Sequence, residues 1–443
     1  MASDLDKFMT VNKDDFPYIF IQHKDAPLRT NHTGVLRCNV YLPKDAAPFG
    51  DETYPVLATY GPYGKDVPYD IFYRKSWDQL NPAMKSAHSS WETPDPGYWT
   101  TRGYIIVRVD ELGSGQSPGL LDTMSQEFWW ENAVQPNQYG KPGREARKWG
   151  LDTLEGDLDE EMLKRNRRNQ MLDTAAHRYR DEEYYKSRDF DASDIEVPLL
   201  SVANWGDCGV DDPEHELAFP LRGEVDWPIP DTEYTKFFLT AGGGLSEKAD
   251  PELSSFTYDA LNGDPLTFKY KANKVFEITG HIVAHFNVSL AAKDDQVPSD
   301  INLFVTLRKL DKSGQEVFFT GTMGDPVSIV KGWQRVSLRK TDESNPLHRE
   351  YLPYRNYYSS DVQEVKAGEV YSVDVEVWPT NVVLEEGETL VFEIAGHDTQ
   401  GVGKFSHDHP EDRPAHVFDG LNTVHVGGES SWLLLPMIPD RSS

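Results

Sequence analysis

The amino-acid sequence predicts an α/β domain followed by an all-β sandwich, and three patterns lead to this prediction. The first half holds short, nearly continuous apolar runs, each ending in a polar, glycine-rich turn. From about residue 230 onward, apolar and polar residues alternate, with turn residues between the runs. Between these parts lies a charged stretch, residues 129–195, that contains no candidate strand. A chain of 443 residues is long enough for two or three domains with real cores.

The apolar runs of the first half have the composition of buried parallel strands. They cover residues 54–60, 104–110 and 197–204, with the sequences YPVLATY, YIIVRVD and VPLLSVAN. Strands covered on both faces carry such continuous runs. Ligands of open α/β sheets bind beyond the carboxyl ends of strands, so the turns GPYGKD, ELGSGQSPG and WGDCG are the first places to look for chemistry. A further run, residues 35–42, alternates more and suits an edge strand.

The middle stretch, residues 129–195, predicts helices. Asp157 can cap a helix that has Glu160 and Glu161 in its first turn and basic residues further along, as the helix dipole favours. Its apolar stripe is thin, and the aromatic clusters Phe128-Trp129-Trp130 and Tyr184-Tyr185 flank the region. We expect a helical cap over a site, and the alternative is a solvated helical insertion.

The second half reads as strands separated by turns. Apolar and polar residues alternate over residues 371–378 and 303–307, and residues 311–314 (DKSG) supply a turn before the next strand. No helical pattern interrupts this texture, which predicts a β-sandwich of the jelly-roll type. The boundary to the first half falls near residues 226–233, where the sequence WPIPDTEY contains two prolines.

Composition excludes several classes of partner. The chain carries 44 basic and 73 acidic residues, a formal net charge of -29, so nucleic acid and anionic membranes are not expected partners. The two cysteines, Cys38 and Cys208, exclude a disulfide framework. No apolar stretch resembles a signal peptide or a membrane span, so we expect a cytoplasmic protein. No nucleotide-binding or zinc motif is present, and we expect no cofactor and no metal.

One segment matches the Gly-x-Ser-x-Gly pattern of serine nucleophiles, namely residues 115–119 (GQSPG). In a nucleophile elbow, the backbone N–H of the residue after the serine helps to form the oxyanion hole. Here that residue is Pro118, which has no N–H. We therefore interpret the segment as a structural loop and do not expect Ser117 to be a nucleophile.

Two further features are ambiguous at this stage. Asp207 follows the third apolar run in a Trp205-Gly206-Asp207 turn. This position fits the carboxylate of a catalytic triad and an ordinary turn aspartate equally well. Histidines gather near Asp398 and at residues 407–416, but without a coordination motif, so surface histidines are a better interpretation than a metal site.

The ordered motifs together resemble one family. YPVLATYGPYGKD, TRGYIIVRVDELGSGQSPG and VPLLSVANWGD are followed by a β region with EITG at residues 277–280, KAGE at residues 366–369 and DVEVWPTNVVLEEGETLVFEIA at residues 374–395. This series resembles the cocaine esterase / X-Pro dipeptidyl-peptidase (CocE/NonD) group of α/β-hydrolases over nearly the whole chain.

The resemblance implies a Ser-His-Asp triad, a helical cap and hydrolysis of esters or X-Pro peptide bonds. It assigns Tyr63 to the tyrosine that donates a hydrogen bond to the oxyanion, and Asp207 approximately to the triad aspartate. The ELGSGQSPG loop matches a structural turn of the family, with Leu112 in place of the family's arginine. Trp129, Trp130 and Trp205 are candidates for substrate binding.

The sequence departs from the family where catalysis is concerned. The chain passes from residues 125–128 directly into Trp129-Trp130, without the helix and strand that lead to the family's nucleophile elbow. After Asp207 it runs through residues 208–215 into the β region, without the segment that bears the catalytic histidine. A sheet shortened in this way would expose new edges, so either the chain repacks, for example by pairing with another subunit, or the sequence is a shortened version.

These observations predict four segments. Residues 1–128 begin an abbreviated α/β-hydrolase domain, 129–195 form a helical cap, 196–229 add the remaining hydrolase strand and a linker, and 230–443 form the jelly-roll sandwich. The predicted function is hydrolysis of a small-molecule or peptide substrate. The alternatives are a catalytically degenerate hydrolase that serves as a binding or scaffold protein, and non-hydrolytic chemistry on a small apolar metabolite.

Overall fold

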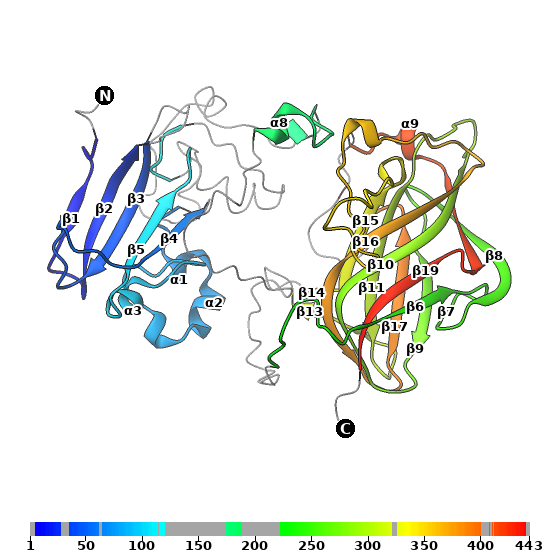
Figure 1. Ribbon diagram of the computed structural model, residues 1–443, viewed down its shortest axis with the longest axis horizontal. Coiled ribbons are helices and arrows are strands. Elements are labelled where there is room, and N and C mark those ends of the chain that lie inside the picture. The colour runs from blue at the N-terminus through cyan, green and yellow to red at the C-terminus, as the bar shows by residue number, and fades with distance from the viewer. Residues whose placement is uncertain are drawn as a thin grey trace. The chain divides into compact units, whose positions relative to one another are not determined.

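The computed structural model describes residues 5–27, 35–61, 64–113, 115–119, 173–174, 176–187, 222–320, 326–399, 407, 410 and 412–439. The chain divides into two compact units, Met1–Ala176 and His177–Ser443. Figure 1 colours the chain from blue at the N-terminus to red at the C-terminus. Each unit has its own hydrophobic core.

In the described part of the N-terminal unit, five strands form a mixed sheet with the order β1-β2-β3-β5-β4 (Figure 1). The strands are β1 (Thr10–Asn12), β2 (Tyr18–Pro27), β3 (Val35–Pro43), β4 (Val56–Gly61) and β5 (Ile105–Asp110). Strands β4 and β5 are parallel, and the other neighbours are antiparallel. The parallel pair predicted from the first two apolar runs is therefore confirmed, whereas the third run, residues 197–204, lies outside the described residues.

Short helices accompany this sheet. They are α1 (Tyr69–Phe72), α2 (Arg74–Gln79), α3 (Pro96–Thr100) and a 3₁₀ turn (Pro82–Met84). Helix α3 lies against β2, β3 and β5, and it begins at Pro96 because the Asp95 carboxylate accepts the Tyr98 N–H at 2.9 Å. None of the helices in the described ranges is long and apolar enough to cross a lipid bilayer.

The prediction that residues 35–42 form an edge strand is wrong, because β3 lies between β2 and β5. The sequence pattern does not single out β2, which pairs with one side of β3. The polar residues that give β3 its alternating pattern do not mark a solvent face. The Asn39 side chain donates to Asp66 at 2.7 Å, and the Arg37 guanidinium pairs with Asp25 at 3.1 Å, so these polar side chains belong to internal contacts.

The expectation that residues 54–60 form a strand buried on both faces is also wrong in part. Val56 and Tyr60 of β4 are 53% and 58% exposed. Within the described residues β4 is the last strand of its sheet and pairs with β5 alone, so it has one neighbour to cover it.

A histidine lies inside the aromatic core of the N-terminal unit. The ring of His88 packs against Phe16, Phe20 and Tyr41, and its Nδ1 lies 2.7 Å from the Tyr18 hydroxyl. Burial, and then the nearby Arg108 charge, lower the pKa of His88 to about 4. The ring is therefore neutral at physiological pH and serves as a core residue.

The C-terminal unit is built on one large folded sheet of twelve strands and a separate pair, β13 and β14. The strands are β6 (Glu233–Leu239), β7 (Leu245–Ser246), β8 (Asp250–Asp259), β9 (Leu266–Lys271), β10 (Phe276–Ala291), β11 (Asn302–Leu310), β12 (Glu316–Val317), β13 (Phe319–Thr320), β14 (Pro326–Val327), β15 (Val330–Arg335), β16 (Val370–Leu384), β17 (Thr389–Ala395), β18 (Leu421–Gly428) and β19 (Trp432–Ile438). The described ranges of this unit also contain the short helices α8 (Glu183–Lys186) and α9 (Ala415–Phe418) and two 3₁₀ turns (Val336–Leu338, Ser359–Asp361).

Two long strands, β10 and β16, run side by side through the C-terminal unit (Figure 1). The apolar residues of β16 at 371, 373, 375 and 377 face the core, as the alternation predicts. The same holds for residues 303, 305 and 307 of β11, and the 311–314 turn leads to β12. The predicted fold class, an α/β-hydrolase domain followed by a β-sandwich, is confirmed.

We expect acid to destabilise the N-terminal unit through His88. Between pH about 6.5 and about 4 the unfolded histidine binds a proton that the folded one does not, so stability falls as pH falls through this window. In His88→Gln the dependence should be shallower, by at most about 1.4 kcal/mol per pH unit. Urea unfolding of both proteins at several pH values from 4 to 7.5 measures this, and parallel curves would contradict it.

Candidate functional site

The candidate site lies at the carboxyl ends of the parallel strands β4 and β5, where the sequence directs the search. A pocket of about 490 Å³ opens beside them. Its lining comes from β4, the turn after β4, the segment before α3, and β5; the residues are Ala58, Thr59, Tyr60, Gly64, Lys65, Ser90, Trp91, Glu92, Thr93, Arg108 and Val109. Two turns flank this edge, GPYGKD and ELGSGQSPG. They are two of the three turns that the sequence analysis names as the first places to look for chemistry.

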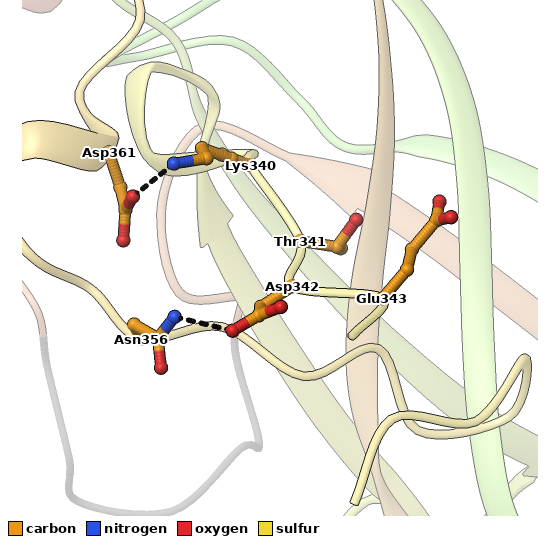
Figure 2. Close-up of a pocket in the computed structure, with 6 residues that line it drawn as sticks. All are labelled: Lys340, Thr341, Asp342, Glu343, Asn356 and Asp361. Carbon is orange, nitrogen blue, oxygen red and sulfur yellow. Dashed lines mark hydrogen bonds and ion pairs between the residues drawn. The ribbon is translucent and has the colours of Figure 1, made fainter. Parts of the chain in front are cut away.

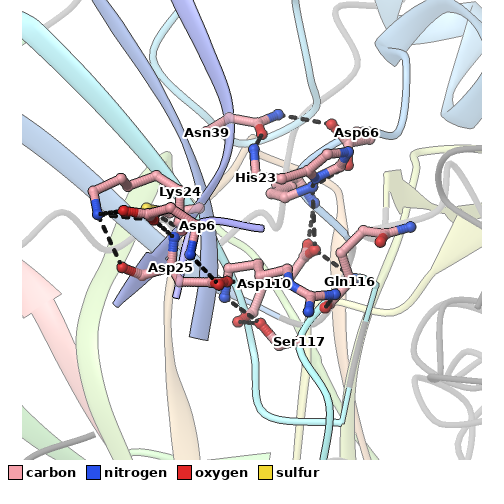
Figure 3. A network of polar contacts seen from close by, with 12 residues as sticks. Asp6, His23, Lys24, Asp25, Asn39, Asp66, Asp110, Gln116 and Ser117 are labelled. Atoms are coloured by element: carbon pink, nitrogen blue, oxygen red, sulfur yellow. Dashed lines mark hydrogen bonds and ion pairs between the residues drawn. The ribbon is translucent and has the colours of Figure 1, made fainter. Parts of the chain in front are cut away.

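A single buried carboxylate, Asp110 at the end of β5, holds both turns (Figure 3). Its Oδ1 accepts the backbone N–H of Lys65 at 2.5 Å, and its Oδ2 accepts the backbone N–H of Gln116 at 2.7 Å. Asp110 has no exposed surface. Gly115 must be a glycine, because a Cβ there would lie 2.4 Å from the Asp110 carboxylate and its φ is +53°.

The charge that faces Asp110 is the ammonium of Lys65. Lys65 Nζ lies 3.6 Å from Asp110 Oδ2 and pairs more closely with Asp66. The Lys65 side chain is 0% exposed, so this ion-pair network is internal. Burial lowers the pKa of Lys65, but Asp110 and Asp66 more than offset that effect, and the pKa ends above its ordinary value. Lys65 is therefore a permanent cation.

Polar groups from β2 and β3 complete the network. His23 Nδ1 lies 3.0 Å from Lys65 Nζ, and Asn39 donates to the Asp66 carboxylate at 2.7 Å. His23 sits at an irregularity in the pairing of β2 with β3 and has a φ of +57°, a backbone geometry of the kind that redirects a side chain. Burial raises the pKa of Asp110, and the Lys65 charge opposes this increase. The network fixes both turns at the strand ends.

Ser117 is part of this scaffold, in agreement with the prediction from Pro118. Its hydroxyl donates to the Asp110 carbonyl at 2.8 Å and accepts the Arg37 N–H at 2.8 Å. The residue is 0% exposed. A hydroxyl that is sealed from solvent and occupied as donor and acceptor cannot attack a substrate, so this loop is structural.

The predicted site residues themselves lie outside the described residues. This applies to Tyr63, Asp207, Trp129, Trp130 and Trp205, and their roles stay predictions. The sequence analysis located the turns but did not single out Lys65, Asp66 or Asp110. The sequence did contain a signal for them, because charged residues directly follow two apolar strands, and parallel neighbouring strands end at the same edge of a sheet.

The histidines near Asp398 make local hydrogen bonds. His407 Nδ1 lies 3.0 Å from Asp398, and the His397 ring nitrogens contact the carbonyls of Asp398 and Gly263. Asp408 and His409 lie outside the described residues. Among the residues that the structure describes, no group of histidine, cysteine and carboxylate side chains is arranged to hold a metal ion.

A second pocket, of about 400 Å³, lies in the C-terminal unit (Figure 2). It is lined by Lys340, Thr341, Asp342, Glu343, Asn356 and Asp361. Three of its four charged groups have partners, since Lys340 pairs with Asp361 at 2.5 Å and Asp342 accepts from Asn356 at 2.9 Å. This arrangement fits a polar surface depression, and the pocket beside β4 and β5 is the better candidate.

One part of the predicted cap region contacts the β-sandwich. The segment that contains α8 donates the Arg180 N–H to the Tyr357 carbonyl at 3.0 Å. Ser359 donates its hydroxyl to Asp181 at 2.7 Å and its N–H at 2.9 Å, and these hydrogen bonds lower the pKa of Asp181. Tyr184 of α8 is buried. The part of the predicted cap around Arg180 and Asp181 is thus attached to the sandwich.

The fold indicates a class of protein, namely an α/β-hydrolase scaffold joined to a β-sandwich. A profile of the C-terminal non-catalytic domain of X-Pro dipeptidyl-peptidases matches residues 206–435, more than half of the chain. A profile of the S15 family of X-Pro dipeptidyl-peptidases matches residues 34–131. The chain therefore belongs to the X-Pro dipeptidyl-peptidase family.

Curated relatives share only part of this chain. Two proteins assigned by name to the serine esterases, from Mycobacterium bovis and Mycobacterium tuberculosis, are each 26% identical over 122 residues, which is 28% of this chain. The chain covers 17% of the length of either protein.

Solved structures with the same fold extend over nearly the whole chain. A CocE/NonD family hydrolase from Staphylococcus aureus is 19% identical with a TM-score of 0.68, and the comparison covers 95% of this chain and 94% of that one. An aminopeptidase from a marine-sediment Thaumarchaeota archaeon is 11% identical with a TM-score of 0.55, covering 97% and 98%. At these identities the likeness shows the fold.

Replacing Asp110 should destabilise the N-terminal unit strongly. Asp110→Asn removes the charge opposite Lys65, and an amide can offer an acceptor to only one of the two backbone N–H groups. Breaking a buried ion pair costs about 3–5 kcal/mol. Urea unfolding followed by tryptophan fluorescence measures the loss.

The matched control for Asp110→Asn is Asp78→Asn, in the exposed Arg74–Asp78 pair, whose side chains are 69% and 57% exposed. A surface pair contributes at most about 1 kcal/mol. Equal losses for the two variants would show that the Asp110 network does not hold the turns.

Removing the hydrogen bonds that attach the α8 segment to the sandwich should make this segment more mobile without unfolding the sandwich. Asp181→Ala removes both acceptors of Ser359, so we expect faster amide hydrogen exchange over residues 177–187. Exchange in β10 and β16 should stay unchanged. Glu183→Ala, in the same segment, is the control. Unchanged exchange at residues 177–187 in Asp181→Ala would contradict the anchoring role.

Proposed function

We propose that this chain derives from serine hydrolases that cleave esters or X-Pro amides. We further propose that its α/β unit, in the sequence given, keeps the substrate-binding turns of that machinery without a working nucleophile. The observation that carries the proposal is the state of Ser117, which is wholly buried and committed to Asp110 and Arg37. It is the serine of the chain's one Gly-x-Ser-x-Gly match.

The substrate class rests on relatives and on the pocket. The names of the related proteins include serine esterase, aminopeptidase and α-amino acid ester hydrolase, so ester and amide carbonyls are the groups that such proteins attack. In this chain, the pocket beside β4 and β5 includes Gly64 and Lys65, which directly follow Tyr63. Tyr63 is the residue that the resemblance assigns to the oxyanion.

Among the residues that the structure describes, β4 ends its sheet, and this supports the shortened-sheet hypothesis. A parallel strand whose Val56 and Tyr60 are more than half exposed fits a sheet from which a neighbouring strand has been removed. The match to the S15 peptidase profile ends at residue 131, in the region where the predicted nucleophile segment is lacking.

A second candidate function is an active hydrolase whose natural form contains the two lacking segments. The curated relatives favour it, because the chain covers 17% of their length and they are named as esterases. The two candidates differ in one measurable quantity, the mass of the natural protein, since the sequence given has a mass of 50.3 kDa.

We expect the full chain to leave Ala-Pro-4-nitroanilide uncleaved and to form no fluorophosphonate adduct within residues 1–176. Peptide mapping after labelling tests this, with Ser117→Ala as the matched control that should behave like the parent chain. An adduct on Ser117 would sink the proposal. A natural protein heavier than 50.3 kDa that cleaves the anilide would establish the second candidate instead.

A further inference from the structure

A serine, a histidine and an aspartate are connected through one imidazole ring on the β-sandwich, far along the chain from the α/β unit. His285 Nδ1 lies 2.6 Å from the Asp374 carboxylate, and His285 Nε2 lies 3.3 Å from the Ser372 hydroxyl. This is the order of contacts in a catalytic triad, in which the carboxylate fixes the ring and the other nitrogen takes the hydroxyl proton.

Strand geometry places these three side chains together on the outer face of the sheet. In the antiparallel pairing of β10 with β16, His285 lies opposite Asp374, and Asn287 lies opposite Ser372. The intervening Phe286 and Val373 are buried in the core, so their neighbours point outward. Ser372 is exposed, and the His285 side chain is 20% exposed, so a small molecule can reach both.

The imidazole is held on its face as well as at its edge. Trp432 of β19 stacks on His285, with ring centroids 4.8 Å apart and an interplanar angle of 9°. The ammonium of Lys236 lies 4.2 Å from the centroid of the Trp432 ring. The backbone below is tied down, since Arg355, itself buried, donates to the Asp374 carbonyl at 2.5 Å. A base with a fixed orientation meets the geometric requirement for proton transfer.

We propose that Ser372, His285 and Asp374 form a second nucleophilic site that accepts acyl groups from activated esters. Ser372 Oγ forms a bond to the ester carbonyl carbon while His285 Nε2 takes the hydroxyl proton. The carbon–oxygen bond to the leaving group then breaks, and the leaving group receives that proton from His285. Water, deprotonated by His285, attacks the acyl-serine, releases the carboxylic acid and restores Ser372.

The contacts described for this site supply a nucleophile, a base and an orienting carboxylate, and this set of groups limits the substrate class. Good leaving groups, such as 4-nitrophenolate, need little stabilisation of the developing oxyanion, whereas amides depend on it. The site is therefore limited to activated esters and related phosphorylating agents. It goes beyond the proposed function, because it lies in the domain whose family profile is described as non-catalytic.

The same sheet contains a matched control. The Ser289 hydroxyl lies 2.9 Å from His425 Nε2, so it too contacts a histidine nitrogen. Among the described residues no carboxylate contact to His425 is found, in contrast to the Asp374 contact of His285. Ser372 and Ser289 therefore differ in the group behind the imidazole, and also in exposure, because Ser289 is half-buried whereas Ser372 is exposed. The Asp374 variant below isolates the effect of the carboxylate at Ser372 itself.

The test is labelling of the full chain with a fluorophosphonate, followed by peptide mapping, together with 4-nitrophenyl acetate hydrolysis. We expect an adduct on Ser372 but not on Ser289, and a decrease of about 10²-fold or more in labelling rate for His285→Gln. Asp374→Asn should slow labelling as well, and Ser372→Ala should reduce ester hydrolysis to the background rate. Ser289→Ala should change neither.

The overturning results are equally defined. Lack of an adduct on Ser372, or a labelling rate on Ser372 that is the same in His285→Gln, would refute the site. Equal labelling of Ser372 and Ser289 would also refute the site, because it would show that Ser372 reacts as an ordinary hydroxyl. Because the adduct is mapped, labelling within residues 1–176 concerns the α/β unit alone and leaves this test separate. Circular dichroism of each variant verifies that the sandwich is folded.

Discussion

The buried carboxylate of Asp110 is the constraint on which the N-terminal unit depends. It stands at the carboxyl end of β5, where the parallel pairing with β4 places two turns within reach. By accepting the backbone N–H groups of Lys65 and Gln116, it fixes both turns, and the Lys65 ammonium balances its charge. A charge without exposed surface is stable only when it is paired and hydrogen-bonded, so these residues form one unit.

This constraint explains why a motif that looks like a nucleophile is not one. The network needs a hydroxyl to connect the Asp110 carbonyl with the Arg37 N–H, and Ser117 supplies it. Gly115 is required because no Cβ fits against the carboxylate. The Gly-x-Ser-x-Gly spacing therefore arises from the packing of a structural loop, and Pro118 is tolerated because no oxyanion hole is built there.

The two units differ in how completely their described sheets are covered. The sandwich has a continuous core between β10, β16 and their neighbours. The α/β unit has a sheet whose described edge, β4, is open. The two turns are thus held in place next to a strand that has a single partner, β5, among the described residues.

The sequence by itself determined the fold class, the two parallel strands and the inward alternation of β16, because side-chain period and local composition encode them. It also determined that Ser117 is not a nucleophile, because the chemistry of Pro118 is local. Only the tertiary structure decided that β3 is internal, since its partner β2 shows no comparable pattern. Likewise, the joining of Lys65 to Asp110, and of His285 to Ser372 and Asp374, depends on strand pairing between residues distant in the chain, which no local pattern records.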